Sequence, residues 1–572
     1  MARIARTKAG GPIHTARAVA VPGDAAGDPV SALSLPGLSA LPGARYSVGG
    51  AVGALPSDLA VAEAGLAALD ERMDAATLRR APASLAAVVH RGRVVALRTH
   101  GQPRRDGATT QADTVFRIAS MSKSFLAAAA LSLRDEGLLD LHAPVTRYVP
   151  ELASAEFGGR CAELTLDLLL SNKGGLAEDN AWGDRHLGLA RADMARHVAD
   201  GLRLSAEPGT TYQYSNLGIS IIGRAIEAVT GSAVEEVIRQ RLLEPLGLSS
   251  TLADAPLYPE GADLAAGFRT FDDGTTFVPE PYVGCGALGC IGSLFSTAAD
   301  MATWMHFLGS ALEPSTAETA AGAADEAVLS ARSRREMQTA RTLMNATATS
   351  LGGRTLEGVG YGYGLVAEHH ARFGRVIQHS GGLPGFSSHM RWHPVSGVGV
   401  VAFGNTDAFG AGAIAGDLLE AVLGTLAVPS GVVRPWAQAR DAAQAVDAAV
   451  RAGDSLGALA DTPGLLSPQL LADASAEVRD ARLSVLLETL GSPLAREPGD
   501  GFAERIVSAP EASTLRWGIP CQNGTLLAEV HLVGLHSPVV QGLTFWMAND
   551  EGTLPAGEPG SSDWRSAAVV EG

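Results

Sequence analysis

A ten-residue stretch, residues 116–125, places a serine and a lysine at the start of an apolar run. It reads Phe-Arg-Ile-Ala-Ser-Met-Ser-Lys-Ser-Phe, and the apolar residues that follow, 126–133, have helical character. Residues three apart lie on one face of a helix, so Ser120 and Lys123 would face the same way. Ser120 would lie at the helix start, where free backbone N–H groups and the helix dipole favour a developing negative charge.

Lysine is rare in this chain, which sharpens the interpretation of that pair. Among 44 basic residues there are three lysines, Lys8, Lys123 and Lys173. Arginine stays protonated in proteins, whereas lysine loses its proton when it is desolvated or lies near another cation. A base at position 123 therefore has to be a lysine. A surface helix with an incidental Ser/Lys pair is the alternative that this motif alone leaves open.

Length, charge and cysteine content exclude several classes of protein. A chain of 572 residues is long enough for more than one domain. Its net charge of −17 argues against binding nucleic acid or an anionic membrane. The four cysteines fit neither a disulfide framework nor a zinc site, and we expect no metal and no cofactor.

The sequence also bears on the compartment. The basic N-terminal residues lead into no apolar segment, and no window of about 18 uninterrupted apolar residues occurs. We therefore expect a cytoplasmic protein without a membrane partner. The sequence leaves its oligomeric state open.

The order of elements predicts one large domain over residues 57–428. Residues 1–56, rich in Ala, Gly, Pro and Ser, are expected to be disordered or loosely ordered, and Ser57 is a plausible N-cap for a first helix. A hairpin over 85–97, the serine helix and a long, mostly helical middle follow. Strand runs then return at 365–368, 376–379, 387–392 and 398–403, and a helix follows over 413–423. A sheet assembled from both ends of the domain, with the middle as a helical lobe, satisfies this order.

The remaining residues predict a second, smaller unit. Residues 429–435 are expected to be a linker, 436–548 a small α+β domain of unknown role, and 549–572 a flexible tail. The expected helices and strands of the small domain are 436–450, 475–490, 515–519, 526–533 and 539–547. The dipeptide Asn523-Gly524 is a strong hairpin signal between two of the strands.

Two further polar clusters share the large domain with Ser120 and Lys123. The first, Tyr214-Ser215-Asn216, follows Pro208-Gly209-Thr210 and precedes an apolar helix. The second, His379-Ser380-Gly381-Gly382, ends a strand run. Taken singly, each is compatible with turn chemistry or with a structural histidine.

The three clusters together, in this order, resemble the serine β-lactamase and penicillin-binding-protein superfamily. That superfamily carries Ser-x-x-Lys, Ser/Tyr-x-Asn and Lys-Thr-Gly-type motifs. The Tyr form of the second motif and the His form of the third are similar to the class C-like branch. This branch includes D-aminopeptidases, alkaline D-peptidases, family VIII carboxylesterases and mitochondrial-type β-lactamase-like proteases. The resemblance covers roughly residues 58–427.

The resemblance implies a fold and a set of roles. The fold would be of the β-lactamase/DD-peptidase type, an α/β (α+β) arrangement with an antiparallel sheet flanked by helices and a helical lobe. Ser120 would be the nucleophile, and Lys123 and Tyr214 would together form the base system. Which of the two holds the proton stays open, because coupled groups titrate as a unit. Tyr214 would also protonate the leaving group, and Asn216 would orient Lys123 and the substrate amide.

The third motif would complete the site and restrict the substrate. Gly381 and Gly382 would orient the substrate, and the backbone N–H groups of Ser120 and Gly382 would form the oxyanion hole. His379 replaces the family's lysine, and a histidine is only partly charged near neutral pH. We therefore expect a peptidase, amidase or carboxylesterase acting on a small molecule or short peptide. The alternatives are a β-lactamase or D-Ala-D-Ala carboxypeptidase, and a non-catalytic binding protein on the same fold.

Overall fold

The computed structural model describes most of the chain: residues 19–20, 45–48, 51–54, 56–104, 108–152, 154–272, 274–312, 320–345, 356–426, 428, 431–495, 501–547 and 567–570. The loosely ordered segment expected over residues 1–56 and the flexible tail expected over 549–572 lie largely outside these residues. The elements described there are β1 Val19–Ala20, β2 Arg45–Val48, β3 Ala51–Ala54 and β24 Ala567–Val570.

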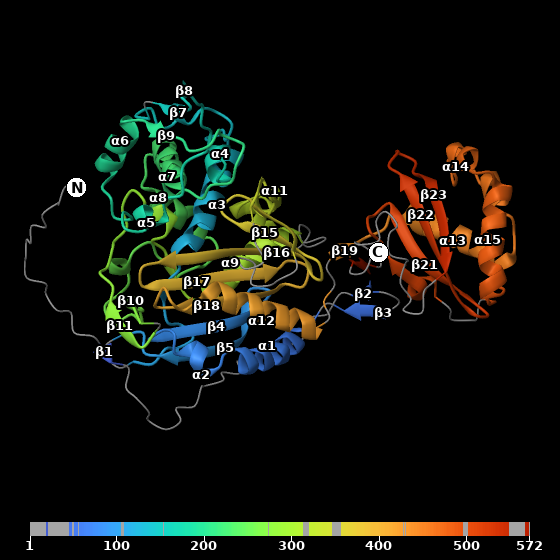
Figure 1. The fold of residues 1–572 in the computed structure, drawn as a ribbon, viewed down its shortest axis with the longest axis horizontal. Helices are drawn as coiled ribbons and strands as arrows, with labels where there is room; N and C mark the ends of the chain where they lie inside the picture. Colours follow the sequence, from blue (N-terminus) through green and yellow to red (C-terminus); the bar gives the residue numbers. More distant parts are fainter. Residues whose placement is uncertain are drawn as a thin grey trace, which may run out of the picture.

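An eight-stranded antiparallel sheet forms the centre of the large domain (Figure 1). Its strands, in spatial order, are β13 Thr342–Leu343, β14 Leu356–Tyr361, β15 Val366–His370, β16 Gly374–Leu383, β17 Phe386–His393, β18 Val398–Gly404, β4 Ala83–His90 and β5 Arg93–Gly101. The N-terminal hairpin β4–β5 therefore completes a sheet whose other strands come from the end of the domain. His90 pairs with Val398 and Ser84 with Gly404.

The central strands are buried on both faces. Since successive side chains of a strand point to opposite faces, one strand contributes residues to two apolar clusters. In β4, Leu85 and Ala87 join one apolar cluster, whereas Ala86 and Val88 join another. Helices α1 Asp58–Arg72 and α12 Ala411–Leu426 cover the second of these faces and pack against each other. Ser57 caps α1, accepting the N–H of Ala60 at 3.2 Å.

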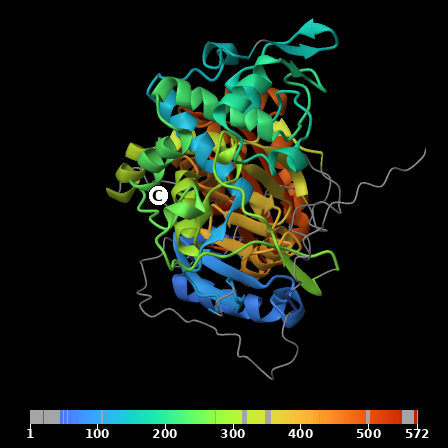
Figure 2. The same ribbon diagram turned by 90° about the vertical axis from the view of Figure 1, so that its left-hand side faces the viewer.

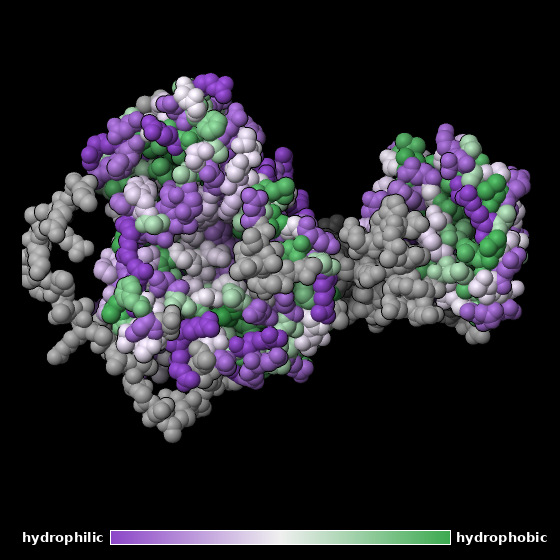
Figure 3. All heavy atoms as spheres, in the orientation of Figure 1, coloured by the Kyte–Doolittle hydropathy of each residue, from purple (hydrophilic) through white to green (hydrophobic). Residues whose placement is uncertain are grey.

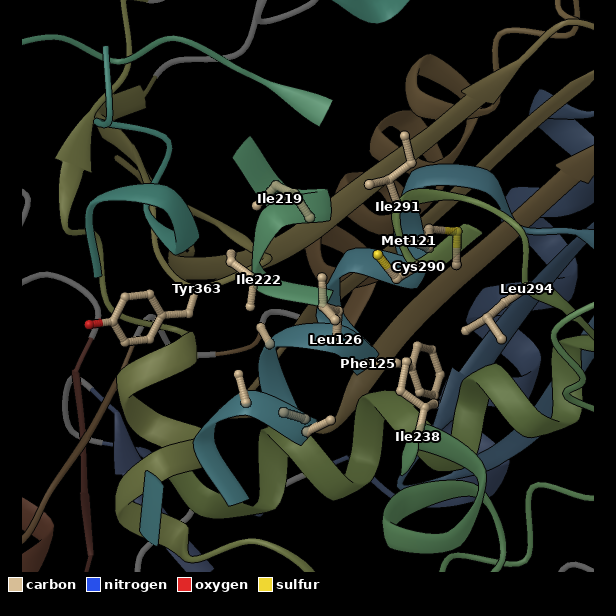
Figure 4. Close-up of a cluster of buried hydrophobic side chains, with 14 of the residues drawn as sticks. Met121, Phe125, Leu126, Ile219, Ile222, Ile238, Cys290, Ile291, Leu294 and Tyr363 are labelled. Atoms are coloured by element: carbon tan, nitrogen blue, oxygen red, sulfur yellow. The ribbon is translucent and has the colours of Figure 1, made fainter. Parts of the chain in front are cut away.

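The opposite face carries the helix that follows the serine motif. Helix α3, Ser122–Asp135, is buried along nearly its whole length, and its apolar run becomes the centre of the larger core. In Figure 4, Phe125 and Leu126 of this helix point among Ile219, Ile222 and Ile238 of neighbouring helices. Helices α9 Ala298–Gly309, α10 Ala320–Val328 and α11 Ala331–Met337 complete this side.

A helical lobe lies above the sheet in Figures 1 and 2. It contains α4 Leu166–Leu170, α5 Asn180–Gly183, α6 Arg191–Ala199, α7 Asn216–Thr230, α8 Val234–Ile238 and the small strands β7 Ala155–Phe157, β8 Arg160–Cys161 and β9 Leu202–Arg203. Helix α8 ends at Ile238, and the residues that follow it, Arg239–Leu243, form a π-helix.

A second unit, at the right of Figure 1, has its own apolar core. Its elements are α13 Ala437–Ala452, α14 Pro468–Asp473, α15 Ala476–Leu490, β20 Ile506–Ser508, β21 Thr514–Cys521, β22 Gly524–Val533 and β23 Val539–Met547. Just before it, β19 Gly431–Val433 pairs with β24. The expected fold class, an antiparallel sheet flanked by helices with a helical lobe and a small α+β unit, is confirmed.

The last features of the fold are the hydropathy of its surface and the apolarity of its helices. On the face seen in Figure 3, hydrophobic residues are interspersed among hydrophilic ones. Within the described ranges, no single helix has the length and apolarity to cross a membrane, although the pair Asn216–Thr230 and Val234–Leu243, bent by 79°, meets that test by length and composition.

Candidate active site

Ser120 lies on a tight turn between a short strand and helix α3. The strand β6, Phe116–Arg117, pairs with β12, Phe295–Ser296, and a single 3-10 turn, Ala119–Met121, leads into the helix. Ala119 has φ of +49°, a conformation that residues other than glycine rarely adopt. Such local strain persists where the surrounding structure enforces it, and it occurs often at functional sites.

Lys123 faces Ser120 from the first turn of α3, as the spacing predicted. Its Nζ lies 2.9 Å from Ser120 Oγ and donates to the carbonyl of Ile291 at 2.8 Å. Burial lowers the pKa of Lys123 to about 7, although the negative charges of Asp184 and Asp179 partly oppose that shift. A neutral lysine is therefore well populated near neutral pH, in hydrogen-bonding contact with the serine hydroxyl.

The loop that carries Tyr214 is held by two anchors. Asn172 accepts the N–H of Ser215 through Oδ1 at 3.1 Å. Asp179 accepts the N–H groups of Asn216 at 2.6 Å and Leu217 at 2.8 Å, at the start of α7. A carboxylate is favoured there by the free N–H groups and by the helix dipole. Sequence analysis did not single out Asp179, because nothing in the local sequence indicates which distant helix its side chain would cap.

Tyr214 lies next to both Ser120 and Lys123. Its hydroxyl hydrogen-bonds to Ser120, and Lys123 Nζ lies 5.0 Å from the centre of its ring. Desolvation raises the pKa of Tyr214 well above its usual value, and the contact with Ser120 only partly offsets this. The phenol therefore keeps its proton at neutral pH and can donate it.

Asn216 is fully buried at the first position of α7. Its Nδ2 donates to Asn180 Oδ1 at 3.0 Å, and its Oδ1 has no hydrogen-bond partner among the residues that the structure describes. A contact with Lys123 is not among its hydrogen bonds. Its orienting role toward Lys123 and a substrate amide stays a prediction.

The third motif lies on β16, beside the turn that carries Ser120. His379 is buried, with Nε2 3.2 Å from the Tyr361 hydroxyl and Nδ1 2.6 Å from the carbonyl of Ser380. Burial, with the nearby Lys123 charge, lowers the pKa of His379 to about 3. The imidazole is therefore neutral at pH 7 rather than partly charged.

The two glycines of this motif meet different surroundings. A Cβ atom at Gly381 would lie 2.0 Å from Ser388 Oγ and 2.2 Å from the carbonyl oxygen of Ile118, so only glycine lets β16 approach the turn that carries Ser120 so closely. A Cβ atom at Gly382 would meet nothing within 4 Å. The Cβ side of Gly382 therefore faces open space, on the opposite face of β16 from the contact that Gly381 makes.

A pocket of about 280 Å³ lies near the end of β16, with Leu383 among its lining residues. It is lined by residues from β6, β12, the loop after α5, the end of β16 and the strands β10 Phe268–Arg269 and β11 Thr276–Pro279, which lie at the left of Figure 1. Leu383, Leu187 and Phe386 are among its apolar lining residues. Asp184 also lines it, and burial raises the pKa of this carboxyl to about 6.

Lys173 and Trp182, which precede α7 in the chain, have structural partners. Lys173 forms an ion pair with Asp167 at 3.2 Å, and Trp182 stacks on His186 with ring centres 4.7 Å apart. All four cysteines are free thiols. Among the described residues, no group of three or more His, Cys, Asp or Glu side chains is placed to hold a metal ion.

Comparisons with known proteins match this chain to one family. The family model described as "Beta-lactamase" matches residues 67–424. Unguisins hydrolase ungD of Aspergillus violaceofuscus is 27% identical over 345 residues, covering 57% of this chain and 59% of that protein. Esterase EstB of Burkholderia gladioli is 32% identical over 209 residues, covering 34% of this chain and 53% of that protein. The chain thus spans little more than half the length of these curated relatives.

A solved structure shares the fold. The octameric penicillin-binding protein homologue from Pyrococcus abyssi has a TM-score of 0.50 and 19% identity to this chain. The alignment covers 83% of this chain and 96% of that one.

Proposed function

Because this chain belongs to the Beta-lactamase family, we propose that it is a serine hydrolase that cleaves an amide or ester through a covalent acyl-enzyme. The observation that carries the proposal is the 2.9 Å contact between Ser120 Oγ and the amine of a buried lysine whose pKa is lowered to about 7. A serine hydroxyl is a weak nucleophile unless a neighbouring base removes its proton.

Lys123 is the base in this proposal. Its neutral amine accepts the Ser120 proton while Oγ forms a bond to the substrate carbonyl carbon. Tyr214 is a poor candidate for this step, because its raised pKa opposes a tyrosinate. The lysine ammonium that forms keeps its contact with the carbonyl of Ile291.

Tyr214 serves the leaving group. Its phenol contacts Ser120, so it is close to the atom that departs when the tetrahedral intermediate collapses. It donates its proton to the departing amine or alcohol and recovers one from Lys123. Water then attacks the acyl-enzyme, releasing the acid and restoring Ser120, so that one bond is hydrolysed per cycle.

The negative charge on the carbonyl oxygen is assigned to two backbone N–H groups. One is that of Ser120, at the start of the helical segment, and the other is that of Gly382 on β16. The close approach of β16 to the nucleophile turn, which Gly381 permits, supports this pairing. Losing one such donor typically costs about 100-fold to 1000-fold in rate.

The neutral state of His379 favours a peptidase, amidase or carboxylesterase over a β-lactamase or D-Ala-D-Ala carboxypeptidase. A fixed cation at this position would attract a substrate carboxylate, and a buried imidazole with its pKa lowered to about 3 supplies none. The substrates that fit this side of the site are uncharged at the leaving group.

The test is covalent labelling of Ser120. A fluorophosphonate probe should label the protein, and Ser120→Ala should abolish labelling and lower hydrolysis by on the order of 1000-fold or more. Ser132→Ala is the matched control: this serine lies on the same helix, its hydroxyl donates to the carbonyl of Ala129, and the variant should label normally. Substrates would be p-nitrophenyl esters, D- and L-amino-acid p-nitroanilides and nitrocefin. Labelling that survives Ser120→Ala, or no acylation by any of these compounds, would reject the proposal.

A further inference from the structure

Arg117 is a buried cation beside the candidate site that the mechanism leaves unused. Only 4% of its surface is exposed, and its Nε and Nη2 have no hydrogen-bond partner within the described ranges. The guanidinium contacts the rings of Tyr282 and Phe295, at 5.5 Å and 5.2 Å from their centres. Burial lowers the pKa of Arg117 to about 10, so the group is still charged at neutral pH.

A buried guanidinium with free N–H groups calls for an anionic partner. Buried charges are normally paired, and unpaired ones are costly. Aromatic rings and the more distant negative charge of Asp254 compensate Arg117 in part, but neither accepts its free N–H groups. A carboxylate does so in a bidentate geometry that a planar guanidinium fits.

Arg117 lines the 280 Å³ pocket, so an anion bound there would lie beside the guanidinium. The other charged lining residues are differently placed. Arg185 and Glu280 form an ion pair with each other. Asp184 also lines the pocket, and its charge acts on Lys123. Apolar side chains such as Leu187, Leu264 and Phe268 complete much of the wall, which suits a short methylene chain.

The position of the pocket along β16 indicates which end of a substrate it would hold, the acyl group or the leaving group. Along β16, His379 lies three residues before Gly382 and Leu383 lies one residue after it, so they flank the expected oxyanion position on opposite sides. The ring of Tyr214, which serves the leaving group, lies 6.5 Å from that of His379. The pocket beyond Leu383 is therefore on the acyl side.

We propose that Arg117 binds a carboxylate at the end of the substrate's acyl chain, so that the preferred substrates are monoesters or monoamides of short dicarboxylic acids. This inference rests on the proposed hydrolase function. It assigns Arg117 to specificity: the residue holds the far end of the acyl group and leaves bond breaking to Ser120, Lys123 and Tyr214. The preferred substrate would therefore carry a negative charge at the end of its acyl group and no charge on its leaving group.

Two esters of matched length test the charge directly. We would compare kcat/KM for p-nitrophenyl hydrogen glutarate and p-nitrophenyl methyl glutarate, which differ in one negative charge. The wild-type protein should prefer the acid by about tenfold or more. Arg117→Gln should lower kcat/KM for the acid by about tenfold or more and for the methyl ester by less than about threefold. Arg98→Gln removes another buried arginine, which lies on β5 and pairs with Asp70 of α1, and it should keep the preference.

A binding measurement separates this inference from the hydrolase proposal. In the Ser120→Ala protein, calorimetry would compare glutaranilic acid with its uncharged primary amide, with and without Arg117→Gln. Tighter binding of the acid that disappears with Arg117→Gln supports the carboxylate site, even if no ester is hydrolysed. Hydrolysis of both esters at equal rates by the wild-type protein overturns the inference while the hydrolase proposal stands.

A structural role for Arg117 has its own signature. If the residue only stabilises the aromatic contacts, Arg117→Gln lowers kcat/KM for both esters equally. Arg117→Lys keeps the positive charge without the bidentate geometry and serves if Arg117→Gln does not fold. It should retain part of the preference for the acid, and equal losses on both esters would overturn the inference.

Discussion

In the proposed mechanism, the protonation state of Lys123 determines whether Ser120 can be activated. The amine is buried, its pKa is lowered to about 7, and it contacts Ser120 Oγ at 2.9 Å. Tyr214 beside it shifts the other way and holds its proton. Environments that separate the pKa values of two neighbouring groups commonly assign one as base and the other as acid.

This separation predicts a pH profile. The basic form of Lys123 gains population as the pH rises, so kcat/KM for an activated ester should increase through about pH 7 and then level off. Lys123→Arg keeps a cation that cannot lose its proton, and it should lower kcat/KM by about 100-fold or more across pH 5 to 9. A rising limb centred below pH 5, or an active Lys123→Arg protein, would contradict the assignment of Lys123 as base.

At the scale of elements, strand β16 and the turn before α3 must touch to form the site. Gly381 is where they meet, since a Cβ atom there would lie 2.2 Å from the carbonyl oxygen of Ile118. A real Cβ cannot approach backbone so closely, so the strand or the turn would have to shift.

The contact predicts that substitutions of the adjacent glycines, Gly381 and Gly382, differ in their effect on stability. Gly381→Ala should lower the free energy of unfolding by about 1–3 kcal/mol through overpacking, and it should also displace the nucleophile turn. Gly382→Ala is the control: its methyl group would meet nothing within 4 Å, so the free energy of unfolding should be unchanged. Chemical denaturation of both variants measures the difference. Equal stability of the two would show that β16 adjusts freely.

Local patterns predicted most elements, and contacts between distant residues account for the rest. The strand runs from 365 to 403 correspond to β15–β18, because alternation and turn residues are local signals. β14, Leu356–Tyr361, was not expected, since its sequence holds two glycines and it owes its extended form to pairing with β15. Tyr361, the partner of His379, was missed with it.

In the candidate site too, local sequence patterns predict some features and contacts between distant residues account for others. Ser120 and Lys123 are three residues apart, so a spacing rule was enough to predict that they face each other. Arg117 belongs to the same motif, but its burial and free N–H groups depend on residues near positions 254, 282 and 295. No local pattern in a sequence contains that information.

At the scale of the whole molecule, two sets of apolar residues form separate cores. The large domain holds two clusters on the faces of its sheet, whereas the cluster that includes Trp517 draws its members from position 433 onward. A unit with its own core can generally fold by itself.

A truncated protein tests this independence. Residues 56–428 alone should keep kcat/KM within about threefold of the full chain, because every residue of the candidate site lies within that range. The full chain should unfold in two calorimetric transitions, and the truncated one in a single transition that matches one of them. Insolubility, or a loss of more than about tenfold in kcat/KM, would show that the second unit supports the site.

The pairing of β4 with β18 has a consequence for how the protein is made. A ribosome releases β4 first, yet the strand that pairs with it, Val398–Gly404, emerges only after roughly 300 further residues. Until then the hairpin β4–β5 has an unpaired edge, and the nucleophile helix lacks the strand that carries Gly382. Pairings this distant are slow to form and expose the growing chain to aggregation. The nascent chain is therefore exposed to aggregation during the interval in which Ser120 has been made but the strands that would complete its proposed site have not.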